Sequence, residues 1–255
     1  MFDQSAPPLT GQVAVIAGGN GGIGYATATR LARAGARVVL LVRSDLAKAQ
    51  TRANELPGTG HGAVLASIDN SEELKRAAAE VVAQWGGADI LVNTAGTTKA
   101  VPHKDLDALD DALIDEMFIS TWRGPFATIR AFAPMLRASG NGLVVNISSI
   151  SATTGVGSNV AYCAAKAGLD VMTVCLGRAL APEIRMINVS PGVVQTTFVP
   201  GRDQAWSDKQ AAAAPLKRVG LPDDIAAAIE ACATTLKFAT GTTIQVDGGR
   251  HLGVA

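Results

Sequence analysis

The chain has few of the residues that build metal centres and disulfide frameworks. Its 255 residues include 3 cysteines and 3 histidines. Cys163, Cys175 and Cys232 show neither a CxxC pair nor metal-ligand spacing, and the histidines are scattered. We therefore expect the cysteines to be ordinary packing residues and the protein to hold no metal ion.

An excess of charge of either sign is also missing. The 22 Lys and Arg residues balance the 22 Asp and Glu residues, which gives a formal net charge of +0. Nucleic acids and anionic membrane surfaces are bound through positive charge. The composition therefore gives no reason to expect either as a partner.

Long hydrophobic runs are absent from the sequence. The apolar run at 38–42 is far shorter than the ~20 residues that a membrane-spanning helix needs. Residues 1–10 carry an acid and two prolines, unlike the basic and then apolar segments of a signal peptide. We therefore expect a cytoplasmic protein that is not embedded in a membrane.

The chain is rich in short runs of Val, Ile and Leu. These runs alternate with longer Ala-rich segments. The runs lie at 13–17, 38–42, 63–68, 90–93, 143–147, 186–189 and 243–246. They are continuously apolar, which is typical of parallel strands buried on both faces. Helices are predicted at 24–34, 45–56, 71–85, 109–136, 159–180 and 222–235.

This alternation predicts an α/β fold. We expect a Rossmann-type, doubly wound parallel sheet of about seven strands with helices on both faces. No linker divides the chain, so residues 1–255 are expected to form a single dinucleotide-binding and catalytic domain. Residues 197–214 are polar and fit this pattern poorly, which makes them a candidate substrate lid.

A glycine-rich loop follows the first predicted strand. It reads Ala17-Gly18-Gly19-Asn20-Gly21-Gly22-Ile23-Gly24, between a strand and an amphipathic helix. Glycine allows a tight turn and a close approach of main-chain N–H groups to a pyrophosphate at the helix N-terminus. Glycine also serves ordinary turns, but this context favours a dinucleotide site. Its candidate residues are Gly18, Asn20, Gly22, Ile23 and Gly24.

The end of the second predicted strand bears on the choice of dinucleotide. An NAD site places a carboxylate there for the ribose hydroxyls, whereas this chain has Val42, Arg43 and Ser44. Arg43 is suited to a 2′-phosphate. We therefore favour NADP, with Arg43 and Ser44 as contacts. NAD stays as the alternative, with Arg43 a solvated loop residue and Asp45 a helix-terminal charge.

From about residue 9 to residue 249 the sequence resembles the short-chain dehydrogenase/reductase family. Six family motifs occur in the family's order and spacing. They are the loop TGxxxGIG, with Ala17 in place of its threonine, then Asn93-Thr94-Ala95-Gly96, Asn146-Ile147-Ser148-Ser149, Tyr162-Cys163-Ala164-Ala165-Lys166, Pro191-Gly192-Val193-Val194-Gln195-Thr196 and Val246-Asp247-Gly248-Gly249. Each motif alone is common, but the ordered set is specific.

The resemblance implies further coenzyme contacts and an oligomer. Asp69 and Asn70 would lie beside the adenine. Asn93, Ala95 and Gly96 would line the coenzyme. Val194 and Thr196 would hold the carboxamide, and Pro191 and Gly192 would shape the nicotinamide pocket. Members of the family are usually homotetramers or homodimers.

Tyr162 and Lys166 are the central candidates for catalysis. Reduction of a ketone needs a proton donor, and the pKa of a free tyrosine, about 10, is too high for good acid/base work near neutral pH. Lys166 lies one helical turn on, so its ammonium group would favour the phenolate and also reach the nicotinamide ribose. Ser149 would polarise the carbonyl of a small-molecule ketone or alcohol substrate. Taken alone, Tyr162 and Lys166 could equally be two side chains in contact on the surface of a helix. Ser149 alone could equally cap a helix or a turn.

One departure from the family concerns the long middle helix. Its usual asparagine, in a pattern like NxxG, is replaced by Thr121 in Ser120-Thr121-Trp122-Arg123-Gly124. In the family the main-chain carbonyl of that asparagine holds a water linked to the lysine, and the residue helps to bend the helix. The main-chain carbonyl is still present when threonine replaces asparagine, so Thr121 stays a catalytic candidate. We expect either an altered path for the proton beyond Lys166 or weaker activity.

Other residues near the expected substrate site have no assigned role. Ser151 and Thr153 follow Ser149, and His103 follows the coenzyme loop. The candidate lid supplies Phe198, Val199, Arg202 and Trp206, whose aromatic rings would cover an apolar substrate or form a subunit contact.

A non-catalytic alternative rests on Ala17 and Thr121. It is a dinucleotide-binding sensor or scaffold on a degenerate dehydrogenase fold. A pure binder has no need of a proton donor, and the presence of Ser149, Tyr162 and Lys166 therefore favours the enzyme.

Overall fold

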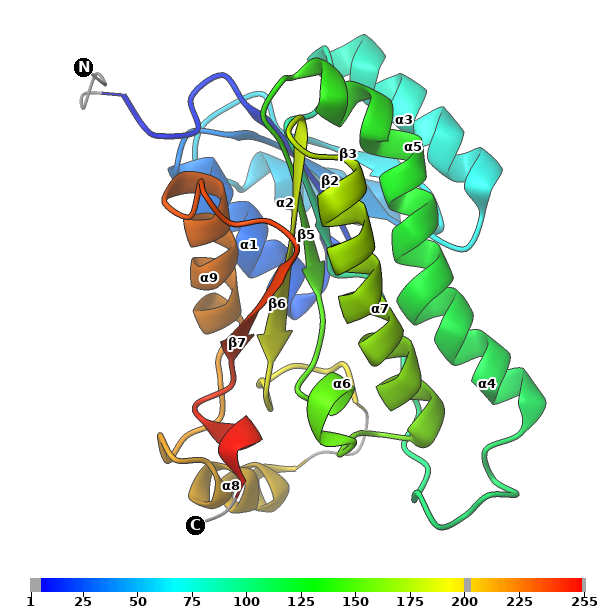
Figure 1. Cartoon of the computed structure of the whole chain (residues 1–255). Coiled ribbons are helices and arrows are strands. Elements are labelled where there is room, and N and C mark those ends of the chain that lie inside the picture. The colour runs from blue at the N-terminus through cyan, green and yellow to red at the C-terminus, as the bar shows by residue number, and fades with distance from the viewer. Residues whose placement is uncertain (1–5, 200–202, 254–255) are drawn as a thin grey trace.

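A computed structural model describes residues 6–199 and 203–253 (Figure 1). Seven parallel strands form one sheet in the order β3-β2-β1-β4-β5-β6-β7, which confirms the predicted fold class. The strands are β1 Val13–Ala17, β2 Arg37–Val42, β3 Gly62–Leu65, β4 Ile90–Asn93, β5 Gly142–Ile147, β6 Ile184–Pro191 and β7 Thr242–Val246. The order reverses between β1 and β4, where doubly wound folds bind ligands at the carboxyl ends of the strands.

Helices cover both faces of the sheet (Figure 1). The helices of the described residues are α1 Gly22–Arg33, α2 Leu46–Asn54, α3 Ser71–Trp85, α4 Asp111–Phe118, α5 Gly124–Ala138, α6 Ser151–Thr154, α7 Val160–Ala179, α8 Gln204–Ala213 and α9 Pro222–Thr234. Leu31 of α1, Ala53 of α2 and Ile229 of α9 belong to the core on one face. Leu74 of α3, Phe132 of α5 and Leu169 of α7 belong to the core on the other, so the strands are buried from both sides.

The helix predicted at 109–136 is present, but it is not α-helical along its whole length. The structure has α4 and α5 joined by the π-helical turn η1, Ile119–Arg123. Pro125 contributes to this break because it has no N–H to donate to the carbonyl four residues earlier, that of Thr121. The other predicted helices and strands agree with the structure to within a few residues.

Helix α7 is long and apolar enough, by length and composition alone, to cross a membrane. Its buried residues Leu169 and Met172 belong to the core on the face of the sheet that α3 and α5 also cover. The buried side of α7 is therefore that of a core helix.

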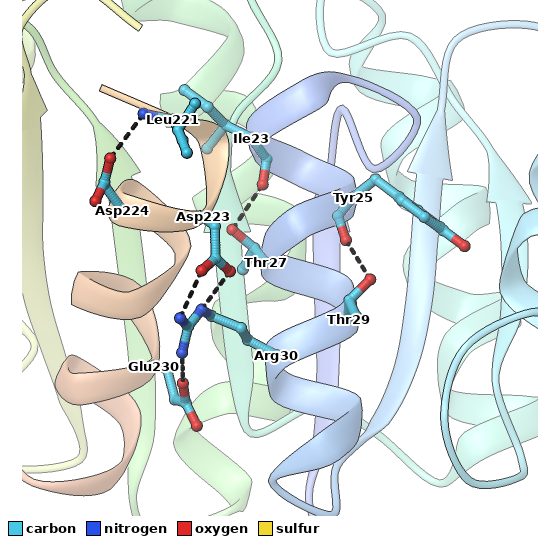
Figure 2. Close-up of polar contacts among 9 residues, drawn as sticks. All are labelled: Ile23, Tyr25, Thr27, Thr29, Arg30, Leu221, Asp223, Asp224 and Glu230. Atoms are coloured by element: carbon cyan, nitrogen blue, oxygen red, sulfur yellow. Dashed lines mark hydrogen bonds and ion pairs between the residues drawn. The ribbon is translucent and has the colours of Figure 1, made fainter. Parts of the chain in front are cut away.

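Helices α1 and α9 are joined by charged side chains (Figure 2). The Arg30 guanidinium donates to Asp223 at 2.7 Å and to Glu230 at 2.8 Å. At the N-terminal end of α1, a Cβ added at Gly22 would lie 3.2 Å from Cγ2 of Thr196 and 3.6 Å from Cγ of Pro222. The start of α1 is therefore packed between the loop after β6 and the start of α9.

Candidate active site

A cleft of about 1790 Å³ runs along the carboxyl ends of the strands. Its walls include the turn after β1, the loops after β4, β5 and β6, and residues of α7, α8 and the C-terminal 3₁₀ turn η2, Arg250–Leu252. It is large enough for a dinucleotide and a small substrate together, since pockets for drug-sized ligands measure about 300–1,000 Å³.

The glycine loop forms one end of the cleft. Gly18, Gly22, Ile23 and Gly24 line it. Gly18 has a φ of 81°, and a Cβ there would lie 2.7 Å from the Ala95 nitrogen. Glycine is therefore needed both for the conformation of the turn and for its close contact with the loop after β4.

The N-terminus of α1 fits the phosphates of a dinucleotide. Gly21 occupies the N-cap, and no side chain caps the helix there. The first N–H groups of a helix have no partner within it and attract an anion. Asn20, by contrast, is not among the lining residues. Its carbonyl accepts from Arg52 at 2.7 Å, and its buried Oδ1 has no hydrogen-bond partner.

Two of the four residues expected at the adenosine end line the cleft. Arg43 and Asp69 do so, whereas Ser44 and Asn70 do not. The Asn70 side chain caps α3 by accepting from the N–H groups of Glu72 and Glu73. A strong capping position thus accounts for the place of Asn70 outside the cleft.

Asn93 lies behind the cleft, while Ala95 and Gly96 line it. The Asn93 Nδ2 donates to Oδ1 of Asn146 at 2.8 Å. Asn146 donates in turn to Thr173 at 3.0 Å, and Thr173 donates to Asn188 at 2.6 Å.

These asparagines form a polar row across the strands. Asn93, Asn146, Asn188 and Thr243 are register partners on β4, β5, β6 and β7. The row ends at Asp170 of α7, whose Oδ1 accepts from Asn188 at 2.8 Å. The sequence analysis did not predict this row. It could have been recognised from the single asparagine that each of the three apolar strands β4, β5 and β6 contains.

The segment after β6 lies at the middle of the cleft. Pro191, Gly192, Val194 and Thr196 all line it. A Cβ at Gly192 would lie 2.9 Å from Cβ of Asp247, so the two loops at the ends of β6 and β7 are in close contact.

Tyr162 and Lys166 project from the same side of α7 into the cleft. The Lys166 Nζ lies 5.7 Å from the centre of the Tyr162 ring and donates to the Ile147 carbonyl at 2.5 Å. Burial lowers the pKa of Lys166 to about 8, and the Asp170 carboxylate opposes this shift. Burial also raises the pKa of Asp170. The Lys166 ammonium is therefore fixed next to Tyr162 and gives up its proton more readily than an exposed lysine.

Ser149 sits at the end of β5 in a short chain of hydroxyl groups. Its Oγ donates to Oγ of Ser151 at 3.0 Å and accepts from the Ser151 N–H at 3.1 Å. The Ser151 Oγ donates to the Val156 carbonyl at 2.9 Å. Ser149, Ser151 and Thr153 all line the cleft.

Asn159 is a residue that sequence reasoning missed. It is fully buried, its Oδ1 accepts from the Tyr162 N–H at 2.6 Å, and its Nδ2 donates to the Lys99 carbonyl at 2.8 Å. Next to it the Val101 N–H donates to the Ser158 carbonyl at 2.8 Å. Asn159 thus ties the first turn of α7 to residues 99–101. Its position three residues before Tyr162 is the usual N-cap signal.

Thr121 lies in the π-helical turn and lines the cleft. It is 2% exposed, and its Oγ1 is buried without a hydrogen-bond partner. π-Helical turns are often found at functional sites.

The remaining candidates gather at the other end of the cleft. Phe198, Val199, Trp206 and His103 line it, and the Phe198 ring centre lies 6.4 Å from that of Tyr162. Arg202 lies outside the described residues. Within residues 6–199 and 203–253, no group of three His, Cys, Asp or Glu side chains is placed to hold a metal ion.

Comparison with known proteins gives consistent relatives. Residues 17–251 match the family described as Enoyl-(Acyl carrier protein) reductase. A protein described as ketoacyl reductase 2 of the granaticin polyketide synthase, from Streptomyces violaceoruber, is 33% identical and covers 94% of this chain and 96% of its own. Acetoacetyl-CoA reductase of Cupriavidus necator is 32% identical, over 96% of this chain and 100% of its own.

Solved structures agree with these relatives. A short-chain dehydrogenase/reductase of the glucose/ribitol dehydrogenase type from Brucella melitensis has a TM-score of 0.88 and 30% identity, and covers 96% of this chain and 98% of its own. A dehydrogenase/reductase from Sinorhizobium meliloti has a TM-score of 0.85 and 32% identity, over 96% of each chain.

Proposed function

Because the chain belongs to the short-chain dehydrogenase/reductase family and is an NAD(P)-dependent oxidoreductase of CH–OH or keto groups, we propose that it transfers a hydride between NADP(H) and a ketone/secondary alcohol pair. The observation that carries this proposal is the position of Lys166, whose buried ammonium lies 5.7 Å from the Tyr162 ring. A non-catalytic dinucleotide binder would have no use for this pair.

Tyr162 is the general acid/base. During reduction its hydroxyl gives a proton to the oxygen of the ketone, and during oxidation its phenolate takes that proton back. The positive charge of Lys166 stabilises the phenolate and so lowers the cost of proton transfer near neutral pH.

Ser149 holds the oxygen of the substrate. Its hydroxyl would exchange its bond to Ser151 for one to the carbonyl oxygen, while the Ser151 N–H still donates to its Oγ. A donor aimed at the oxygen that gains negative charge stabilises the transition state.

The coenzyme supplies the hydride. The N-terminus of α1 with Gly18, Gly22, Ile23 and Gly24 would hold its phosphates. The other lining residues with proposed coenzyme contacts are Asp69, Ala95, Gly96, Lys166, Pro191, Gly192, Val194 and Thr196. Ser44, Asn70, Asn20 and Asn93 do not line the cleft, so their side chains are left out of the proposed contacts.

The preference for NADP rests on Arg43. It is exposed at the cleft and makes no ion pair with any residue in 6–199 or 203–253. Asp45, the nearest acid along the chain, is turned to capping α2, where it accepts from the Lys48 N–H. The end of β2 thus offers a cation and no carboxylate to the ribose, which favours a 2′-phosphate.

Thr121 is proposed to act through its main-chain carbonyl, as the resemblance implies for this position. Pro125 has no N–H to give to that carbonyl, and the buried Oγ1 of Thr121 has no partner, so both oxygens are suited to a water molecule. Such a water would link Thr121 to Lys166 and complete a path for protons.

A ketone substrate is favoured over an enoyl substrate. Three residues separate Tyr162 from Lys166, whereas the enoyl-reductase branch has a longer interval. The names of the relatives, ketoacyl reductase and acetoacetyl-CoA reductase, support the same choice.

We also propose a cytoplasmic homotetramer or homodimer of single-domain chains, with 197–214 as a lid. The exposed apolar side chains of Val171 and Val174 on α7 support a subunit contact. Trp206 on α8 lines the cleft, which supports the lid. Light scattering during size-exclusion chromatography measures the oligomeric state directly.

The decisive experiment combines a substrate panel with one variant. NADPH oxidation is followed with diketones, quinones, oxoacyl thioesters and cyclic ketones, and Tyr162→Phe is tested with each ketone that reacts. We expect Tyr162→Phe to lose about two to four orders of magnitude in turnover while its affinity for NADPH is kept. Normal turnover in Tyr162→Phe would refute the mechanism, and tight NADPH binding without any turnover would favour the sensor.

A further inference from the structure

The substrate end of the cleft is lined by one arginine and two histidines and, among the described residues, by no carboxylate. Among the described lining residues, Asp69 is the one carboxylate, and it follows β3 at one edge of the sheet. Arg250 and His251 follow β7 at the opposite edge, next to α8, and His103 lines the same cleft. A substrate that extends from Tyr162 past Phe198 towards α8 would therefore meet the guanidinium of Arg250.

Arg250 is the most unusual of these residues because it is partly buried and has no carboxylate partner. Its guanidinium donates to the Gln210 carbonyl at 3.1 Å and to Oε1 of Gln210. Both acceptors are neutral, and Arg250 makes no ion pair within the part of the chain that the structure describes. A guanidinium has five N–H donors, of which these contacts use two.

The nearest acid does not neutralise Arg250. Asp247 turns its carboxylate into the C-terminal turn, where it accepts from the N–H groups of Gly249 and His251 and pairs with Nδ1 of His251 at 2.7 Å. Its side chain is 3% exposed and does not line the cleft. These bonds fix the turn that presents Arg250, and the remaining donors of the guanidinium are left for a ligand.

We propose that Arg250 binds an anionic group of the substrate, so that the protein acts on ketones that carry a carboxylate or a phosphate. Gln210 orients the guanidinium from α8. A planar guanidinium with free donors matches the oxygens of either anion. This inference rests on the proposed ketone reduction and adds the class of substrate.

The test compares matched pairs of ketones. Acetoacetate is paired with methyl acetoacetate, and acetoacetyl-CoA with the N-acetylcysteamine thioester, which lacks the phosphates. In the unaltered protein we expect kcat/KM to favour the anionic member of at least one pair, which also shows whether a carboxylate or a phosphate is bound. In Arg250→Gln that preference falls by about tenfold or more, because a hydrogen bond to a charged group is lost. Arg250→Lys keeps the positive charge and should therefore retain part of the preference for the anionic ketone.

Lys209→Gln is the matched control. Lys209 is exposed on α8 next to Gln210 and does not line the cleft, so the same loss of charge should leave every kcat/KM within about twofold. A second measurement needs no variant: malonate or inorganic phosphate should inhibit methyl acetoacetate reduction competitively, and dimethyl malonate should not.

The outcomes separate this inference from the proposed function. An equal loss for charged and neutral ketones in Arg250→Gln would mean that Arg250 only holds α8, and the inference would be overturned while ketone reduction stands. The inference is likewise overturned if neither anion competes and the unaltered protein shows no preference within either pair. If the unaltered protein reduces none of the four ketones nor any in the wider panel, the proposed function itself fails.

Discussion

The ammonium group of Lys166 and the ring of Tyr162 face one another from successive turns of α7, with Nζ 5.7 Å from the ring centre. The same Nζ is anchored by the carbonyl of Ile147 at the end of β5. The helix therefore sets the spacing of the two groups, and the strand holds the ammonium group in place.

Activity should depend on the protonation of Lys166. Because burial lowers its pKa to about 8, the ammonium is present below that pH and is lost above it. We expect kcat/KM for ketone reduction to fall as pH rises through about 8. Lys166→Arg, whose guanidinium does not titrate in this range, should lose activity but lack this fall. Profiles of kcat/KM from about pH 6 to pH 10 are measured for the unaltered protein and for Lys166→Arg. An identical fall in the arginine variant would mean that a group other than Lys166 titrates.

The same shift predicts how stability depends on pH. The folded pKa of Lys166, about 8, lies below the ordinary value of 10.5, so the unfolded chain binds more protons between these limits. The contribution of Lys166 to the free energy of unfolding should therefore rise with pH across this window. Urea titrations of the unaltered protein and of Lys166→Met compare the two slopes, and equal slopes would contradict the shift.

Arg43 should determine the choice of coenzyme. Arg43→Ala is expected to weaken NADPH binding by about tenfold or more and to leave NADH binding unchanged, because only NADPH carries the 2′-phosphate. Lys48→Ala, an exposed charge on α2 outside the cleft, serves as the control. Fluorescence titration gives the affinity of each of the three proteins for each coenzyme. Equal affinities of the unaltered protein for the two coenzymes would remove the basis for the role of Arg43.

Asn159 should affect stability and catalysis separately. Asn159→Ala loses both the cap on Tyr162 and the bond to Lys99, and we expect a loss of about 1–2 kcal/mol in the free energy of unfolding together with a lower kcat/KM. Asn159→Ser keeps a capping oxygen but does not reach Lys99, so it should recover most of the stability and keep a raised KM. If KM follows stability in both variants, the contact with residues 99–101 has no role of its own.

The ion pairs between α1 and α9 should contribute modestly to stability (Figure 2). Arg30→Ala removes the contacts with Asp223 and Glu230, and we expect a loss of about 1 kcal/mol that shrinks in high salt, since Asp223 is largely exposed. Arg33→Ala, an exposed arginine on the same helix without an ion pair to a described residue, should change the free energy of unfolding by less than about half of that. Urea unfolding at two salt concentrations checks this, and a loss independent of salt would point to packing instead.

Much of the architecture follows from local patterns. The continuously apolar runs predicted the parallel strands because a strand covered on both faces needs apolar side chains at every position. The glycine loop was recognisable because a positive φ at Gly18 and the close packing at Gly24 admit no side chain. The family resemblance implied a bend near Thr121, but the π-helical turn η1 itself was not predicted, because the apolar periodicity continues through it, although Pro125 was visible in the sequence.

The sequence by itself determined the sheet, the turn at the helix N-terminus and the Ser149, Tyr162 and Lys166 set, because each depends on residue types at short, fixed spacings. Only the tertiary structure placed Asn93 in a row with Asn146 and Asn188, since the register of separate strands decides which side chains meet. Contacts between residues far apart in the sequence also joined Asn159 to Lys99 and brought Arg250 to Gln210. No periodicity along the chain encodes such contacts, because they form only when separate elements pack together.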